Sequence, residues 1–360
     1  PAPPLRLGAD VHVHLTMKRA LPFYSGEPGD GTLAESPHQA LVNQVDPASL
    51  RRAGARLLFA ALWPPPARAG RTRLDEALHQ ARALDAFARR RPDFAIARDA
   101  RHARAILGRG QIALVPALEG AEAISSVADV DVLAAAGYRV IGLVHFIDNE
   151  IADAQDDQFG PMLGRVLNGR DGGLTELGRS AVRRMFELGL LVDLSHASPR
   201  TIDDVLKLAE EHGAPLLYSH AGASMHGRTL SDEHARRILA GEGVIGMGVF
   251  RSDFLAPVPT SEHWPGYQPD TCDDVIAHWA HYAALGDPRR VVLGSDFGSV
   301  IDRARPGGAC PHGLRSSADL PYLFAGLIGR GIAREALDGS GELVLQLLER
   351  ALGDDGSISR

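Results

Sequence analysis

Short apolar runs alternate along the chain with longer stretches in which apolar residues recur every three or four positions. The short runs are typical of buried parallel strands and the longer stretches of amphipathic helices. We predict strands at 7–13, 57–62, 112–118, 139–144, 190–194, 214–218, 243–249 and 290–294. We predict helices near 72–90, 98–107, 128–136, 174–188, 199–212, 231–241 and 270–285, and further helix from 317 to 352.

Alternation of strands and helices predicts an α/β protein with a parallel sheet, and eight such units predict a (β/α)8 TIM barrel. Because no break in composition interrupts the pattern, we expect a single barrel domain over residues 1–360. Four irregular segments follow predicted strands, and we expect them at the active face as lids or substrate walls. These segments are 18–48, 147–173, 250–270 and 302–316.

Side chains that can bind a metal stand where six of the apolar runs end. His12 and His14 close the first run, and one such residue closes each of five others: Glu119, His145, His196, His220 and Asp296. In a (β/α)8 barrel the carboxyl ends of the strands meet on one face. The sequence therefore predicts that these residues share one site.

The donor types favour a pair of zinc ions. His12 and His14 point to the same side of a strand because side-chain direction repeats every second residue. Imidazole nitrogens suit Zn²⁺, and the two oxygens of Glu119 can bridge two cations. Asp296 can orient or deprotonate a water shared by two metals about 3.5–4 Å apart. Structural roles stay open for single residues: Glu119 as a helix cap, Asp296 as a partner of loop backbone.

The positions of the lysines limit which kind of residue could bridge two metal ions. Many two-metal barrel hydrolases are bridged by a carboxylated lysine at a strand end. This chain has two lysines, Lys18 in a predicted loop and Lys207 in a predicted helix, and neither ends a strand. Glu119 is the one glutamate at a predicted strand end, so any bridge must be an ordinary carboxylate.

Composition excludes several other classes. The formal net charge of −7 gives no basic footprint for nucleic acid. No apolar run approaches the roughly 20 residues of a membrane span.

Cys272 and Cys310 imply no disulfide framework; free thiols are the favoured interpretation, and pairing stays open if they lie close. The start PAPPLRL lacks Met, so a removed leader or a trimmed start stays open, and with it a cytoplasmic or a periplasmic or exported location.

Several segments resemble the membrane (renal) dipeptidase family, zinc peptidases of family M19 in the amidohydrolase-like superfamily. The resemblance spans roughly residues 7 to 345. It is carried by ALEGAEAI, GYRVIGLVHFIDNEIAD, GLTELGRSAVRRMFELGLLVDLSHAS, PLLYSHA, GRTLSDEHARRIL and VVLGSDFGSV. It implies a metallo-dependent hydrolase barrel with two Zn²⁺ per chain, acting on dipeptides or N-acyl amino acids, including dipeptides with a D-residue at the C-terminal position. It also implies a homodimer.

The resemblance assigns roles to the ligand residues. It implies a first zinc ion on His12 and on the residue at position 14, and a second on His196 and His220, with Glu119 as the bridge between them.

Four residues are expected to act on the substrate. By resemblance, His145 contacts the substrate or the tetrahedral intermediate, Arg228 binds the terminal carboxylate, and Asp296 handles the proton of the water. Trp63 directly follows the second predicted strand, from where it would line the pocket.

The chain departs from the family at informative positions. The family has His-x-Asp on its first strand, whereas the second position here is His14, which removes one negative charge from the first metal's ligands. The segment between His220 and Arg228 is shorter than usual. These departures leave two alternatives: the same metal site acting on a lactone, an ester or a non-peptide amide, or a catalytically weakened barrel that serves as a binding protein.

Overall fold

The computed structural model describes residues 1–16, 44–64, 72–155, 172–222, 230–250, 255, 258, 260–299 and 303–352. Within it the chain divides into two compact units. Unit 1 comprises residues 1–58, 220–235 and 245–343, and unit 2 comprises residues 59–219, 236–244 and 344–360.

Eight of the strands form a closed parallel barrel. They are β1 (Gly8–Val13), β2 (Ala55–Leu62), β4 (Ile112–Leu118), β5 (Val140–Gly142), β6 (Leu191–Asp193), β7 (Leu216–Ala221), β8 (Val244–Met247) and β9 (Val291–Leu293). The hydrogen-bonded order is β2-β1-β9-β8-β7-β6-β5-β4, and a β2–β4 pairing closes the ring. All eight predicted strands are confirmed, and the fold class is the (β/α)8 barrel. An extra strand, β3 (Phe94–Ile96), pairs with β4 in parallel.

The predicted helices are also present, with bounds that differ by a few residues. They are α2 (Arg73–Arg90), α3 (Ala100–Gly108), α4 (Val127–Ala135), α6 (Glu176–Glu187), α7 (Pro199–His212), α8 (Asp232–Ala240) and α9 (Cys272–Ala283). The stretch predicted as further helix from 317 to 352 is divided into a 3-10 turn (Ser317–Asp319), α10 (Leu320–Gly329), α11 (Arg334–Asp338) and α12 (Ser340–Leu352). None of the described helices has the length and apolar character that a membrane crossing requires.

One strand and one α-helix were not predicted. The strand β3 has only three residues, too few for a period to be recognised. The helix is α1 (Pro47–Ala53), at the end of the segment predicted as an irregular loop over 18–48. Its start is set locally, because the Asp46 carboxylate accepts hydrogen bonds from the backbone N–H groups of Ala48 and Ser49. Residues 18–43 of that segment lie outside the described part of the chain.

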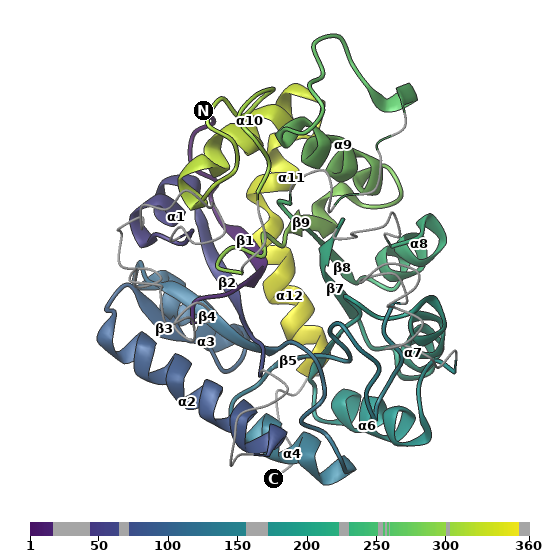
Figure 1. The fold of residues 1–360 in the computed structure, drawn as a ribbon. Helices are drawn as coiled ribbons and strands as arrows, with labels where there is room; N and C mark the ends of the chain where they lie inside the picture. Colours follow the sequence, from purple (N-terminus) through teal and green to yellow (C-terminus); the bar gives the residue numbers. More distant parts are fainter. Residues whose placement is uncertain are drawn as a thin grey trace. The chain divides into compact units, whose positions relative to one another are not determined.

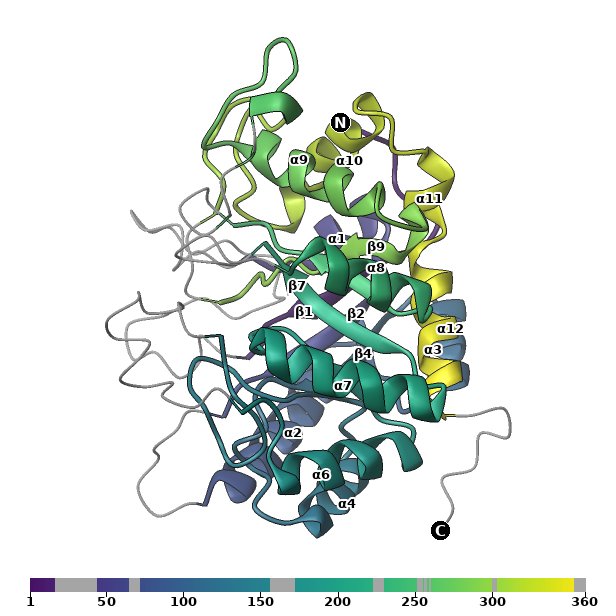
Figure 2. The same ribbon diagram turned by 90° about the vertical axis from the view of Figure 1, so that its right-hand side faces the viewer.

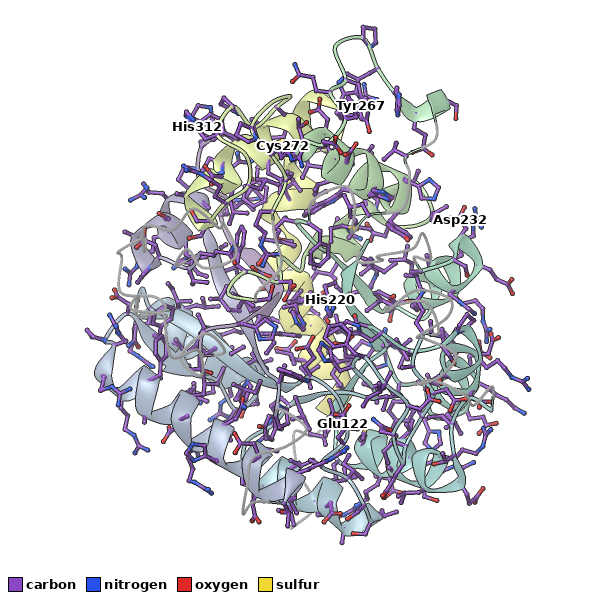
Figure 3. The ribbon with its side chains drawn as sticks, in the orientation of Figure 1. Glu122, His220, Asp232, Tyr267, Cys272 and His312 are labelled. Carbon is purple, nitrogen blue, oxygen red and sulfur yellow. A yellow bond between two sulfur atoms is a disulfide. The ribbon has the colours of Figure 1, made fainter. Side chains whose placement is uncertain are left out.

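Unit 1 contains β1, β9 and most of β8, paired in register, with Asp10 opposite Leu293. Helices α9 and α10 lie side by side in this unit (Figure 1). Cys272 opens α9, where Figure 3 labels it, and forms a disulfide with Cys310 of the loop that follows β9. The expectation of free thiols is therefore wrong: the two Cα atoms lie 5.9 Å apart, within the range that a disulfide bridges.

Unit 2 contains β3 to β6 and the helices that cover them. In Figure 2, α4, α6 and α7 follow one another along the side of this unit, and each contacts the next. The strands are buried along their whole length in β4, β5 and β6, as expected of a parallel sheet covered by helices. This rigid frame carries three of the predicted site residues on the segments that leave its strands.

Candidate metal centre

Unit 1 brings together three of the predicted residues. Nε2 of His14 lies 3.1 Å from Oδ1 of Asp296, and Nε2 of His12 lies 3.7 Å from the same oxygen. All three side chains are buried, and their donor atoms fall within 4.8 Å of one another. Two imidazoles and a carboxylate at this spacing can hold a divalent metal ion. The carboxylate that was expected to handle a proton thus lies among atoms that could also bind a metal.

Backbone bonds between β1 and the residues after β9 fix this group. The N–H of Asp296 donates to the carbonyl of His12 at 2.8 Å, and the N–H of His14 donates to the carbonyl of Phe297 at 2.7 Å. Position 298, directly after Phe297, must be glycine, because a Cβ on Gly298 would stand 1.8 Å from the carbonyl oxygen of His14. Asp296 itself has a φ of 54°, the left-handed region that residues other than glycine adopt at a cost, often at functional sites.

A buried arginine lies behind Asp296. Arg303 is 1% exposed, and its guanidinium donates hydrogen bonds to the carbonyl oxygens of Ser295 and Asp296 and, at 2.9 Å, to Oγ of Ser299. Burial alone would raise the pKa of the Asp296 carboxyl. The hydrogen bond from His14 and the charge of Arg303 outweigh it, and they hold that pKa well below its usual range. The carboxylate is therefore kept ionised, as a ligand or a base requires.

His220, the fifth residue of β7, belongs to the same unit. Its ring centroid lies 4.0 Å from that of His12. The side chain is buried, as are those of its strand neighbours. Unit 1 thus contributes three imidazoles and one carboxylate to the candidate centre.

Unit 2 holds a second group of donors. Oε1 of Glu119 lies 3.4 Å from Nε2 of His196 and 3.5 Å from Nε2 of His145. Glu119 directly follows β4, and its backbone N–H donates to the carbonyl of Leu62 at the end of β2. His196 has a φ of 66°, so it leaves its strand in the same left-handed conformation as Asp296. The three donor atoms again fall within 4.8 Å of one another.

Aromatic rings surround the second group. The ring of Phe146 lies 3.7 Å from that of His145 and 5.5 Å from that of His196, measured between centroids. Trp63 lies 5.2 Å from His145. The half-buried indole thus stands beside a predicted substrate-contacting histidine. Phe146 was not anticipated, although its position directly after His145 is a signal that the sequence offers.

Arg228, the predicted carboxylate-binding residue, lies outside the described part of the chain. Three further polar residues beside the site were not among the predicted site residues: Asp10, Asp193 and Arg303. Asp193 bonds Ser195 and Ser219.

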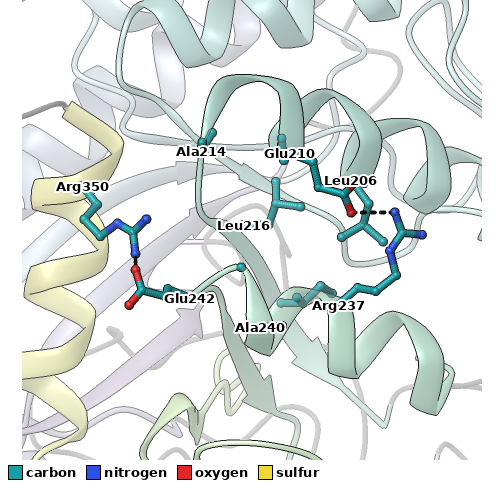
Figure 4. Close-up of a pocket in the computed structure, with 12 residues that line it drawn as sticks. Leu206, Glu210, Ala214, Leu216, Arg237, Ala240, Glu242 and Arg350 are labelled. Atoms are coloured by element: carbon teal, nitrogen blue, oxygen red, sulfur yellow. Dashed lines mark hydrogen bonds and ion pairs between the residues drawn. The ribbon is translucent and has the colours of Figure 1, made fainter.

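A cavity of about 270 Å³ elsewhere in unit 2 is lined by none of the predicted site residues. It lies among α7, β7, α8 and α12, with Leu206 and Leu216 among its apolar lining (Figure 4). Its charged side chains are engaged with one another: Arg237 pairs with Glu210 at 2.9 Å, and Arg350 pairs with Glu242. The cavity therefore offers no uncompensated charge to a ligand.

The residues present fit a zinc-type cation. Both groups combine imidazole nitrogens with a carboxylate oxygen, which are ligands that Zn²⁺ accepts. No cysteine competes, because both cysteines of the chain are disulfide-bonded. Each group supplies three donors from two or three separate strand ends, so folding itself assembles the ligands.

Comparison with known proteins identifies relatives across nearly the whole chain. The family model for membrane dipeptidases, peptidase family M19, matches residues 10–346. Two uncharacterised dipeptidases of Schizosaccharomyces pombe are 33% identical over 216 residues and 31% identical over 230 residues. These alignments cover 59% and 63% of this chain, but only 46% and 49% of the relatives. The chain thus spans about half the length of the curated relatives it matches.

Solved structures share the fold. A dipeptidase of family M19 superposes with a TM-score of 0.72 at 22% identity, covering 98% of this chain and 100% of the other. The probable dipeptidase PvdM from Pseudomonas aeruginosa gives 0.73 at 20% identity, covering 96% and 95%. A metallopeptidase from Rhodobacter sphaeroides, solved with a phosphinate mimic of the dipeptide L-Ala-D-Ala, gives 0.72 at 22% identity, covering 98% and 100%.

Proposed function

Since the chain belongs to the membrane dipeptidase family, peptidase family M19, we propose that it is a dinuclear zinc enzyme that hydrolyses the amide bond of dipeptides. The observation that carries the proposal is the presence of two donor groups, the buried His12–His14–Asp296 and Glu119–His145–His196, in which His196 is partly exposed. Both groups stand at carboxyl ends of barrel strands, which is the face where such barrels perform their chemistry.

The ligands are assigned as follows. His12 and His14 hold the first zinc ion, His196 and His220 hold the second, and Glu119 bridges the two. The positions of the first pair, on one side of β1, and the lack of a strand-end lysine support this assignment. Two Zn²⁺, when bound, acidify a shared water and polarise the scissile carbonyl.

The protein's own groups then move the protons and orient the substrate. The Asp296 carboxylate accepts the proton of the attacking water, because His14 and Arg303 keep it ionised, and delivers that proton to the leaving amine. The His145 imidazole stabilises the negative charge that develops on the carbonyl oxygen. The neighbouring rings of Phe146 and Trp63 restrict the orientation of that imidazole.

Substrate selection is assigned to residues around this core. Arg228 pairs with the free carboxylate of the substrate, a contact that favours dipeptides or N-acyl amino acids over longer chains. Trp63 lines the pocket. The proposal includes dipeptides with a D-residue at the C-terminal position, the kind of ligand that the phosphinate in the Rhodobacter sphaeroides structure mimics.

The same site could instead act on a lactone, an ester or a non-peptide amide, an alternative supported by His14. A neutral ligand in place of the family's carboxylate leaves the first metal more electrophilic and its water more acidic. Such a metal suits substrates whose leaving groups need less proton assistance.

Metal analysis combined with a substrate panel tests the proposal. The purified chain is loaded with Zn²⁺, dialysed and assayed on L,L- and L,D-dipeptides, N-acyl amino acids, lactones and aryl esters. Two zinc ions per chain with dipeptide turnover are expected. Two zinc ions with turnover of lactones or esters alone would transfer the assignment to the alternative. A chain that retains no zinc and cleaves nothing would indicate a binding protein on the same barrel.

A further inference from the structure

Two buried aspartates that the proposed chemistry does not use make the same three hydrogen bonds. Asp10 is on β1 in unit 1, and Asp193 ends β6 in unit 2. They are 0% and 5% exposed. A buried carboxylate is costly unless donors surround it, so both positions require an explanation.

The carboxylate of Asp10 connects two strand ends. Its Oδ1 accepts the backbone N–H of His12 at 3.2 Å and that of Ser295 at 2.9 Å. Its Oδ2 accepts the hydroxyl of Ser295 at 2.5 Å. In the parallel pairing of β1 with β9, Asp10 is registered with Leu293, two residues before that serine.

The carboxylate of Asp193 repeats this pattern on another pair of strands. Its Oδ1 accepts the backbone N–H of Ser195 at 3.0 Å and that of Ser219 at 2.9 Å. Its Oδ2 accepts the hydroxyl of Ser219 at 2.6 Å. In the pairing of β6 with β7, Asp193 is registered with Leu217, again two residues before the serine.

The residues that follow the two serines belong to the proposed metal centre. Ser295 precedes Asp296, and Ser219 precedes His220. Along its own strand, each aspartate also lies just before a proposed ligand, His12 in one case and His196 in the other. Each aspartate therefore connects the backbone before one metal-site residue to the backbone before another on the adjacent strand.

We propose that Asp10 and Asp193 are positioning residues for the two metals, acting through Ser295 and Ser219. We call each arrangement of one aspartate with its serine a strand-end clasp. The Asp10 clasp fixes the backbone of His12 relative to the residue before Asp296, and the Asp193 clasp fixes the residue before His196 relative to Ser219, the residue before His220. This inference rests on the proposed function, because the residues it positions are the proposed metal ligands and the catalytic carboxylate.

The geometry at the strand ends explains why a clasp is needed. Asp296 and His196 have φ values of 54° and 66°, so the chain leaves the regular extended conformation there. Ser295 and Ser195 lie one residue before these two positions, and their backbone N–H groups need acceptors where the regular strand ends. The aspartate supplies one to each, and a charged acceptor holds donors more tightly than a neutral one does.

Each clasp variant should weaken the binding of one of the two zinc ions. Asp10→Asn and Ser295→Ala alter the first clasp, and Asp193→Asn and Ser219→Ala alter the second. Outer partners of metal ligands typically change metal affinity by about 10–100-fold. We expect each variant to raise one of the two stepwise zinc dissociation constants by that factor and to leave the other within about threefold. The constants are measured by competition with a chromophoric chelator, on chains whose folding is checked by circular dichroism.

A matched control separates positioning from folding. Asp319 is also a buried aspartate, and it accepts the backbone N–H groups of Arg315 and Ser316. Asp319→Asn should lower the melting temperature of the metal-free protein without changing either dissociation constant. If the clasp variants behave like this control, the clasps are only structural and the inference is overturned.

The failure of the proposed function would look different. A wild-type chain that binds no zinc would refute the metal centre itself. A wild-type chain that binds two zinc ions, with unchanged constants in all four clasp variants, would refute the clasps alone. Should the aspartate variants fail to fold, the two serine variants decide the question, because they remove one hydroxyl and keep the carboxylate.

Discussion

Nε2 of His14 lies 3.1 Å from Oδ1 of Asp296, so the residue that departs from the family pattern contacts the proposed catalytic carboxylate directly. Where relatives are expected to place an aspartate, this chain places a neutral donor beside a carboxylate kept ionised by its surroundings. The proposed base therefore lies directly beside the position where a carboxylate is replaced by an imidazole.

His14→Ala should weaken the binding of the first zinc ion without releasing the second. Because even indirect partners of metal ligands change affinity by about 10–100-fold, loss of a direct ligand should cost about 100-fold or more. His14→Asp, which restores the expected family residue, should bind the first zinc ion more tightly than the wild type, because it adds an anionic oxygen. Zinc content after dialysis against graded chelator measures both. Equal retention in all three proteins would exclude His14 as a ligand.

Glu119→Gln should weaken the binding of both zinc ions together. A neutral amide oxygen cannot offer two anionic oxygens to two cations, so a true bridge fails on both sides. Chelator competition should show both dissociation constants raised. Glu76→Gln, at a buried glutamate of α2, is the matched control and should leave both constants unchanged. Loss of one zinc ion alone would contradict the bridge.

Removing the disulfide should destabilise the protein strongly. Cys272 and Cys310 close a loop with a sequence separation of 38, for which the chain-entropy treatment gives about 4 kcal/mol. Cys272→Ser combined with Cys310→Ser should lower the free energy of unfolding by up to that amount, measured with urea under non-reducing conditions. A double variant as stable as the wild type, or labelling of both thiols in the non-reduced wild type, would argue against the pairing.

His281 should make stability depend on pH. Its Nε2 lies 2.8 Å from Oδ1 of Asp232 and its Nδ1 lies 3.2 Å from Oε1 of Glu262, so both ring nitrogens face carboxylates. Burial would lower the pKa of His281, but these two carboxylates outweigh it and raise that pKa above 6.5.

The direction in which stability changes with pH follows from the linkage between proton binding and folding. A raised folded-state pKa contributes stability that is complete below the unfolded-state pKa of about 6.5 and disappears as the pH rises through the folded value. The difference in unfolding free energy between the wild type and His281→Gln should therefore be largest near pH 5.5 and shrink above pH 6.5. Urea unfolding at a series of pH values measures it. A difference that stays constant across this range would show that the ring does not change its charge there.

Most of the barrel could be predicted from the sequence because its strands carry a local signal. Runs such as IALVPAL are buried throughout, and their apolar composition is visible without any tertiary information. β3 was overlooked because its three residues are too few to display a pattern. The disulfide was left open in favour of free thiols for a different reason: Cys272 and Cys310 come together only through the packing of α9 against the loop after β9, and no local rule reports that proximity.

For the candidate site, the sequence could predict which residues are candidates but not how they are arranged. The positions of His12, Glu119 and Asp296 at strand ends were sufficient to propose them as site residues. The sequence could not reveal that Asp296 stands between two imidazoles, or that His145 joins Glu119 and His196 as a third donor. Those relationships depend on how neighbouring strands are registered, and a register is a property of the pair rather than of either strand.

The Cys272–Cys310 bridge has a practical consequence for every metal measurement on this chain. Both cysteines are buried, so dithiothreitol, a common additive, would reduce the bridge when the chain opens or unfolds, whereas it would chelate zinc of the proposed centre directly through its two thiolates. A preparation kept in it would lose metal first and covalent closure later, and the two losses would look alike in an activity assay. Purification without thiols, followed by zinc titration, keeps the two variables separate.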